Sequence, residues 1–171
     1  MWYPTCANAT FHIWTAAFAF MTDNLLAKAG DTIAIASDHA GVDLKAALKS
    51  DLASLGYKVL DLGPATTDSV DYPDFGHALA DSISSGKAKA GVAICGSGIG
   101  ISIAVNRHKG LRAALVHDKT SAELARQHND ANVLALGARF TPADAARDIV
   151  KTFFATPFEG GRHARRVEKL G

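Results

Sequence analysis

From residue 31 onward, short apolar segments alternate with longer amphipathic ones, and this alternation restricts the fold more than any other feature of the chain. The short segments are rich in Val, Ile, Leu and Ala, which is typical of strands buried on both faces of a parallel sheet. The longer segments repeat apolar residues at helical spacing. Strands are expected at 32–37, 58–62, 90–95, 111–116 and 132–136, and helices at 41–55, 72–85, 98–108, 119–128 and 142–155.

This order of elements predicts a single α/β domain from 31 to 171, built as a Rossmann-like αβα sandwich around a five-stranded parallel sheet. With right-handed crossovers, the simplest strand order is 2-1-3-4-5. Thr141 is expected to cap the last of these helices, with Pro142 at its first position. Ligands of such sheets bind beyond the carboxyl ends of the strands, near the switch between strands 1 and 3.

The first 30 residues lack this alternation and are expected to form a leader outside the domain. Their apolar run at 11–21 is about ten residues long, whereas a membrane-spanning helix needs about 20. No Lys or Arg precedes the run, so the positive region of a signal peptide is missing. We expect Met21 to be the natural start of the protein. The alternative is that the leader packs against a neighbouring chain.

Charge and cysteine content disfavour several classes of protein. Eighteen basic and 17 acidic residues leave a net charge of +1, which argues against general binding to nucleic acid or to a membrane surface. Cys6 and Cys95 are too few for a disulfide framework and have no zinc-binding spacing. We therefore expect a reducing, cytoplasmic location and no metal. The glycines at 96–100 match neither GxGxxG nor a Walker motif, which disfavours a dinucleotide or nucleotide cofactor.

The segment from Cys95 to Gly100, with the sequence CGSGIG, follows the third expected strand and enters a helix. Its three glycines allow the backbone to approach a ligand closely and expose N–H groups at a helix N-terminus. Such groups favour the thiolate of a neighbouring cysteine, so Cys95 is a candidate base or nucleophile. The structural alternative is a small buried residue at the end of a strand, which is the commoner role of a lone cysteine.

Other polar groups follow the remaining strands and helices. Asp38 and His39 suit hydrogen bonds to hydroxyls or phosphate, although on their own an Asx turn with a capping role is the favoured interpretation. His128, near the end of a helix, can transfer protons at neutral pH. Arginines bind phosphate in a fork geometry or form a solvated basic surface. The candidates are Arg139 after the last strand and the tail residues Arg162, His163, Arg165 and Arg166.

Five segments together resemble the type B ribose-5-phosphate isomerases. They are SDHAG (37–41), DYPDF (71–75), ICGSGIGISIAVN (94–106), RQHNDANVLALGAR (126–139) and EGGRHARRVE (159–168). They occur in that family's order and spacing, and the likeness covers 31–169. The resemblance implies a cytoplasmic enzyme of the pentose phosphate pathway that interconverts ribose 5-phosphate and ribulose 5-phosphate. It also implies no metal or cofactor, and a homodimer that often pairs into a tetramer.

The resemblance further implies a role for each matched residue. Cys95 corresponds to the general base that forms the enediolate, and Ser97 to a hydrogen-bond donor for the reacting oxygens. The N–H groups of Gly96, Gly98, Ile99 and Gly100 correspond to an anion hole. His128 corresponds to the acid that opens the sugar ring, reaching into the pocket of a neighbouring chain. Asp38, His39 and Asn129 would hold sugar oxygens, Arg139, Arg162 and Arg166 the phosphate, and Tyr72 would line the pocket.

Two features bear on how far the resemblance extends. Ser97 stands where many relatives have threonine, a change that keeps the hydroxyl. Some relatives lack the cysteine and use a glutamate elsewhere, so Cys95 indicates the cysteine branch. Related enzymes isomerise allose, galactose or tetrulose phosphates, and these substrates are the alternative within the enzyme class. A non-catalytic module that binds a sugar phosphate is the alternative outside it.

Overall fold

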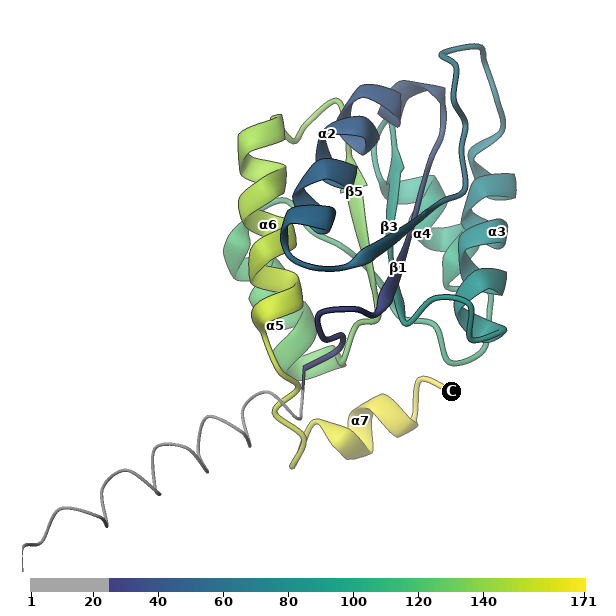
Figure 1. The fold of residues 1–171 in the computed structure, drawn as a ribbon. Coiled ribbons are helices and arrows are strands. Elements are labelled where there is room, and N and C mark those ends of the chain that lie inside the picture. The colour runs from purple at the N-terminus through teal and green to yellow at the C-terminus, as the bar shows by residue number, and fades with distance from the viewer. Residues whose placement is uncertain (1–24) are drawn as a thin grey trace, which may run out of the picture.

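The computed structural model describes residues 25–171, and Figure 1 shows a central sheet with helices on both sides. Most of the expected leader, including Cys6 and Met21, lies outside the described residues. The strands are β1 (Thr32–Ser37), β2 (Lys58–Asp61), β3 (Ala90–Cys95), β4 (Ala113–Leu115) and β5 (Val133–Gly137). The helices are η1 (His39–Gly41), α2 (Val42–Ser54), α3 (Tyr72–Ser84), α4 (Ile99–Val105), α5 (Lys119–Asn129), α6 (Ala143–Ala155) and α7 (Ala164–Glu168).

All four pairs of neighbouring strands are parallel, so the prediction of a five-stranded parallel αβα sandwich is confirmed. Each face of the sheet has its own apolar core, because successive side chains of a strand point to opposite faces. On one face, Ile35 and Ile94 pack with residues of α2, α5 and α6. On the other face, Ala36, Ala93 and Cys95 pack with residues of α3 and α4.

The observed strand order is β2-β1-β3-β5-β4, so the predicted order is wrong for its last two strands. Burial explains the difference. All five residues of β5 are buried, whereas β4 has three residues that are only half-buried. The longer, fully buried strand takes the central position, and the short one lies at the edge. As a result β5 pairs directly with β3, and Gly137 lies opposite Cys95.

The start of α6 also differs from the prediction. Pro142 has an extended ψ of 149°, so it takes the N-cap position itself and the helix begins at Ala143. The hydroxyl of Thr141 is buried and, within residues 25–171, makes no hydrogen bond. Thr141 is therefore not the cap. Because proline fixes only its own φ, the sequence pattern did not determine which residue would be the first in the helix.

A buried lysine fixes the loop that follows β2. Lys45 is 4% exposed, and its ammonium group donates to Asp61 Oδ1 at 2.6 Å and to the carbonyl oxygen of Pro64 at 2.8 Å. Asp61 also accepts from the backbone N–H of Gly63 at 3.0 Å. Partial burial raises the pKa of Asp61, but hydrogen bonds from Lys45 and Lys49 outweigh it and lower the pKa to about 2.

Replacing Asp61 with Asn should therefore destabilise the fold in a pH-dependent way. At pH 7 we expect the free energy of unfolding to fall by about 1–2 kcal/mol, since solvent screens the partly exposed carboxylate. The folded-state pKa lies below the unfolded value, so this stabilisation is complete above about pH 4 and disappears as the pH falls toward 2. Urea denaturation across this range checks it, with the exposed Asp144→Asn as control. A constant difference between Asp61→Asn and the parent across the range would contradict it.

Candidate active site

A cavity of about 430 Å³ opens at the carboxyl ends of β1, β3 and β5. The loops that follow these strands contribute most of its lining, and the beginnings of α3 and α4 complete it. The predicted site residues that line it are Asp38, His39, Tyr72, Cys95, Gly96, Ser97, Ile99, Gly100 and Arg139. Ile103, one turn further along α4, also lines the cavity and is half exposed, although nothing in the sequence pattern marked it as a site residue.

Cys95 ends β3 with only 3% of its surface exposed, yet it lines the cavity. The backbone N–H of Gly98 donates a hydrogen bond to its Sγ at 3.0 Å. Gly98 has a left-handed φ of +79°, and a Cβ at this position would lie 2.4 Å from Leu115 Cδ1. Only glycine fits this conformation, and the conformation directs the N–H of residue 98 toward the sulfur.

Two further glycines allow side chains of the site to lie against the backbone. The guanidinium carbon of Arg139 is 3.2 Å from the position that a Cβ on Gly96 would occupy. A Cβ on Gly100 would lie 2.5 Å from ring atoms of Tyr72. The pairing of β5 with β3 brings Arg139 here, because its N–H donates to the carbonyl oxygen of Gly96 at 3.1 Å. The glycines therefore make space for the arginine and the tyrosine at the cavity wall.

Asp38 and His39 have well-defined local partners. Asp38 Oδ1 accepts from the N–H groups of Ala40 at 2.9 Å and Gly41 at 3.2 Å, which is the capping role given above as the structural interpretation. Its Oδ2 accepts from the N–H of Gly96 at 3.4 Å and so connects the ends of β1 and β3. The N–H of Val70 donates to His39 Nδ1 at 3.3 Å, which leaves Nε2 to carry the proton of a neutral ring.

The amides of the glycine turn are partly used inside the protein. Gly98 N–H bonds to Cys95, Gly96 N–H to Asp38, and Ile99 N–H to Ser97 Oγ at 3.3 Å. The predicted anion hole is thus not a set of free donors. A ligand oxygen bound here would share these amides with the side chains that they now contact. Ser97 accepts from Ile99, so its own O–H can donate to a ligand.

The other predicted residues form a second cluster at the opposite end of the sheet. His128 and Asn129 end α5, which runs back toward the amino ends of the strands, and α7 lies below that end in Figure 1. The ring of His128 stacks on that of His163, with centroids 4.3 Å apart and planes 3° from parallel. Arg162, Arg166, His128 and Asn129 are absent from the lining of the cavity beside Cys95.

His163 was recognised in the sequence only as part of the cationic tail. It is 4% exposed, and Arg162 Nε donates to its Nε2 at 3.3 Å. Burial lowers the pKa of His163, and nearby positive groups, with His128 foremost, lower it further. A lowered pKa favours the neutral form of the His163 ring, so the positive charge of the second cluster comes mainly from its arginines.

One group of side chains in residues 25–171 has ligand atoms close enough for a metal ion. These atoms, from His128, Glu159 and His163, lie within 4.8 Å of one another. An imidazole lone pair lies in its ring plane, and the two stacked planes do not meet at one ion. The group therefore fits a metal poorly. The absence of a metal from the reaction remains a prediction.

No helix in residues 25–171 is both long and apolar enough to cross a membrane.

The family model described as Ribose/Galactose Isomerase matches residues 33–170. The ribose-5-phosphate isomerase B of Escherichia coli is 41% identical over 138 residues, which cover 81% of this chain and 93% of that protein.

Two solved structures show the same similarity in three dimensions. The ribose-5-phosphate isomerase B of Clostridium thermocellum is 48% identical, with a TM-score of 0.81 over 82% of this chain and 95% of that one. The type B ribose 5-phosphate isomerase of Trypanosoma brucei is 40% identical, with a TM-score of 0.80 over 82% of this chain and 97% of that one. Both sequence and fold therefore agree over about four-fifths of this chain.

Proposed function

The chain belongs to the Ribose/Galactose Isomerase family, and on this basis we propose that it interconverts ribose 5-phosphate and ribulose 5-phosphate through an enediolate. The observation that carries the proposal is the position of Cys95. Its sulfur accepts a hydrogen bond from Gly98, and the residue lines the cavity beside Ser97 and Arg139. A thiolate stabilised in this way is a suitable base for the proton next to a sugar carbonyl.

The reaction proceeds in three steps, and the protons balance in each. In the first, His128 donates a proton to the ring oxygen as its bond to C1 breaks, and the C1 hydroxyl gives its proton to water, which yields the open aldehyde. In the second, the Cys95 thiolate removes the proton from C2, and the electron pair forms the C1–C2 double bond and places negative charge on O1. In the third, the thiol returns the proton to C1, while O1 gains a proton and the C2 hydroxyl loses one, which leaves the ketose.

Each of the remaining residues has a place in these steps. The Ser97 O–H and the amides of the glycine turn stabilise the enediolate oxygens. His39 presents its Nε2 proton to a sugar or phosphate oxygen, and Asn129 holds a hydroxyl. Tyr72 forms the cavity wall above Gly100. Asp38 acts mainly through the backbone amides that it holds, and so keeps the first and third strand ends together.

The active site is proposed to form between two chains of a homodimer, which can pair further into a tetramer. One chain places Cys95 at the carboxyl ends of the strands and His128 near their amino ends, so neither cluster is complete alone. When two copies are related by a two-fold axis, the Cys95 cluster of each chain can face the His128 cluster of the other, because a symmetric interface repeats each contact. Each pocket then contains the base of one chain and the acid of the other.

Arg166 is expected to bind the phosphate of the substrate together with Arg162 and Arg139. Replacing Arg166 with Ala should raise KM for ribose 5-phosphate on the order of 100-fold, since truncating one partner of a desolvated charge pair costs several kcal/mol. The adjacent Arg165→Ala is the matched control and should leave KM within about twofold, the usual range for an exposed charge. An equal rise in KM for unphosphorylated ribose would contradict the phosphate role.

An isomerase assay with four-, five- and six-carbon sugar phosphates tests the proposed substrate. We expect the highest kcat/KM with ribose 5-phosphate, because the names of the relatives specify it and the family description includes ribose. The family description also includes galactose, so a higher kcat/KM with a hexose phosphate would assign the alternative substrate. Binding without exchange of the C2 hydrogen with solvent would identify a non-catalytic module. A cytoplasmic location and a place in the pentose phosphate pathway remain predictions.

A further inference from the structure

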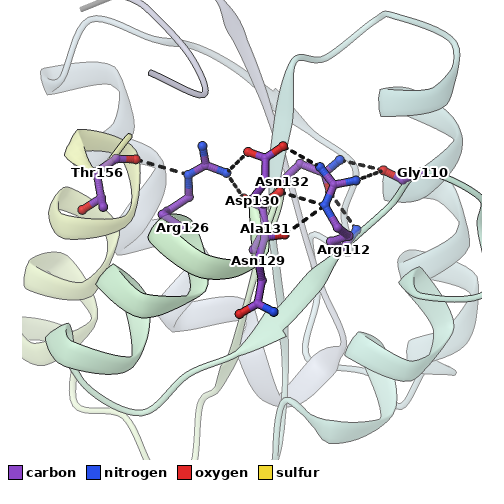
Figure 2. A network of polar contacts seen from close by, with 8 residues as sticks. All are labelled: Gly110, Arg112, Arg126, Asn129, Asp130, Ala131, Asn132 and Thr156. Atoms are coloured by element: carbon purple, nitrogen blue, oxygen red, sulfur yellow. Dashed lines mark hydrogen bonds and ion pairs between the residues drawn. The ribbon is translucent and has the colours of Figure 1, made fainter. Parts of the chain in front are cut away.

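The helix that carries His128 ends at a residue held between two arginines. Asp130, which follows α5, has a left-handed φ of 46° and accepts hydrogen bonds through both carboxylate oxygens. Arg126 Nη1 donates to Oδ1 at 2.9 Å, and Arg112 Nη2 donates to Oδ2 at 2.9 Å. Figure 2 shows the carboxylate lying between the two guanidinium groups. We call these three residues the Asp130 clamp.

Arg126 anchors one side of the Asp130 clamp in the protein interior. It is 1% exposed, and it also donates to the carbonyl oxygens of Ala131 at 2.6 Å and Thr156 at 3.3 Å. Burial lowers the pKa of Arg126, and the charge of Asp130 opposes that change. A buried guanidinium is costly unless it is paired, so Asp130 and Arg126 hold each other in place.

Arg112 anchors the other side through the backbone. Its Nε donates to the carbonyl oxygens of Asn129 at 3.1 Å and Asp130 at 2.9 Å, and its Nη1 donates to that of Gly110 at 3.2 Å. The Asn129 carbonyl belongs to the peptide unit immediately after the last turn of α5. The Asp130 clamp therefore fixes the backbone on the carboxyl side of His128 from two independent directions.

The segment before the tail is held at the same place. The N–H of Glu159 donates to the carbonyl oxygen of Gln127 at 3.1 Å, and this segment leads to His163, whose ring stacks on that of His128. His128 itself is half-buried and lies between these fixed points. Its ring direction therefore depends on how α5 ends.

We propose that the Asp130 clamp is a positioning device that directs the His128 side chain toward the sugar ring in the partner's pocket. This inference rests on the proposed role of His128 as the ring-opening acid. Arg126, Asp130 and Arg112 do not touch the substrate. They act through the backbone that they hold, and a displacement of about 1 Å at a catalytic group can cost on the order of 100-fold in rate.

A double-mutant cycle between Asp130→Asn and His128→Asn tests the proposal. Asn keeps the size of Asp and tolerates the left-handed conformation, so the loss is mainly that of charge. We expect Asp130→Asn alone to lower kcat for ribose 5-phosphate by on the order of 10- to 100-fold. In the His128→Asn background, where the small open-chain fraction of the sugar sustains residual turnover, the same change should lower kcat by less than about twofold.

Two controls separate positioning from loss of folding. Asp51→Asn removes a carboxylate that pairs with Arg147 at 3.1 Å between α2 and α6, far along the chain from His128, and should leave kcat unchanged. Arg112→Lys keeps the charge but loses the fork, and should lower kcat less than Asp130→Asn does. Near-ultraviolet circular dichroism and gel filtration verify the fold of each variant. If Asp130→Asn does not fold, Arg112→Lys takes its place in the cycle.

The outcomes distinguish the clamp from the function on which it rests. If the double variant loses kcat by the product of the two single losses, Asp130→Asn and His128→Asn act independently. That result would overturn the positioning role and leave the isomerase proposal intact. Normal kcat in His128→Asn would overturn both the acid assignment and the clamp, while an inactive Cys95 variant would still support the isomerase. An effect of Asp130→Asn on kcat that appears only when His128 is present supports the clamp directly.

Discussion

Replacing Cys95 with Ala should abolish isomerisation. General-base catalysis contributes on the order of 10²- to 10⁴-fold, and we expect a loss at the upper end of this range because Cys95 is the proposed base for the C2 proton. Among the described residues that line the cavity, Cys95 is the sole thiol, and its sulfur is already hydrogen-bonded to Gly98. Exchange of the C2 hydrogen with solvent should disappear together with turnover, as NMR in D₂O would show.

Binding of the sugar phosphate should survive this change. The Ala side chain is smaller than that of Cys, and the arginines and histidines of both clusters remain. The Gly98 N–H loses its acceptor, so we expect a stability cost of about 1 kcal/mol, which thermal unfolding would measure. Cys6→Ala is the matched control and should retain full activity. Near-normal turnover of Cys95→Ala would show that another group is the base.

Mixing two severely impaired variants should restore activity. Cys95→Ala and His128→Ala each lack one of the groups that the proposed reaction needs. In a mixed dimer with sites shared between chains, one pocket carries both substitutions and the other carries neither. Random exchange of equal amounts makes about half of the dimers mixed, so activity should reach about a quarter of the wild-type value.

The mixing experiment needs proof that the chains exchanged. The two variants are tagged with different masses, unfolded together and refolded, and the mixed dimer is counted by native mass spectrometry. Each variant treated alone in the same way is the control and should keep only its own low residual activity. If every site lay within one chain, each pocket would lack one group, so a sample that stays at the residual activity of the separate variants despite verified exchange would reject the shared site.

The carboxyl-end half of the site could be predicted from the sequence because its residues are close together along the chain or at the ends of strands. Cys95, Ser97 and the glycines belong to one turn, and the parallel sheet brings Asp38 and His39 to the same end. Arg139 is different. The predicted strand order would have separated it from Cys95, and the pairing of β5 with β3 places it against Gly96.

The Asp130 clamp shows why other parts of the site were not predicted. Arg112 and Asp130 are 18 residues apart, and nothing in the sequence pattern indicates that one holds the backbone of the other. The stacking of His128 on His163 joins residues from α5 and from the tail, which the sequence presents as separate motifs. Such contacts depend on how the helices are oriented, and apolar periodicity does not specify this orientation.

The sequence by itself determined the alternation of strands and helices, the parallel sheet, and the identity of the glycine turn with its cysteine. These follow from local causes, namely side-chain period, β-branched composition and the freedom of glycine. Only the tertiary structure decided that β5 lies between β3 and β4 in the sheet. It also decided that the turn amides are already bonded to Asp38, Cys95 and Ser97. The direction of α5 placed His128 at the other end of the sheet. Those outcomes depend on which strand buries more apolar surface and on the direction of each helix, which are properties of the packed chain as a whole.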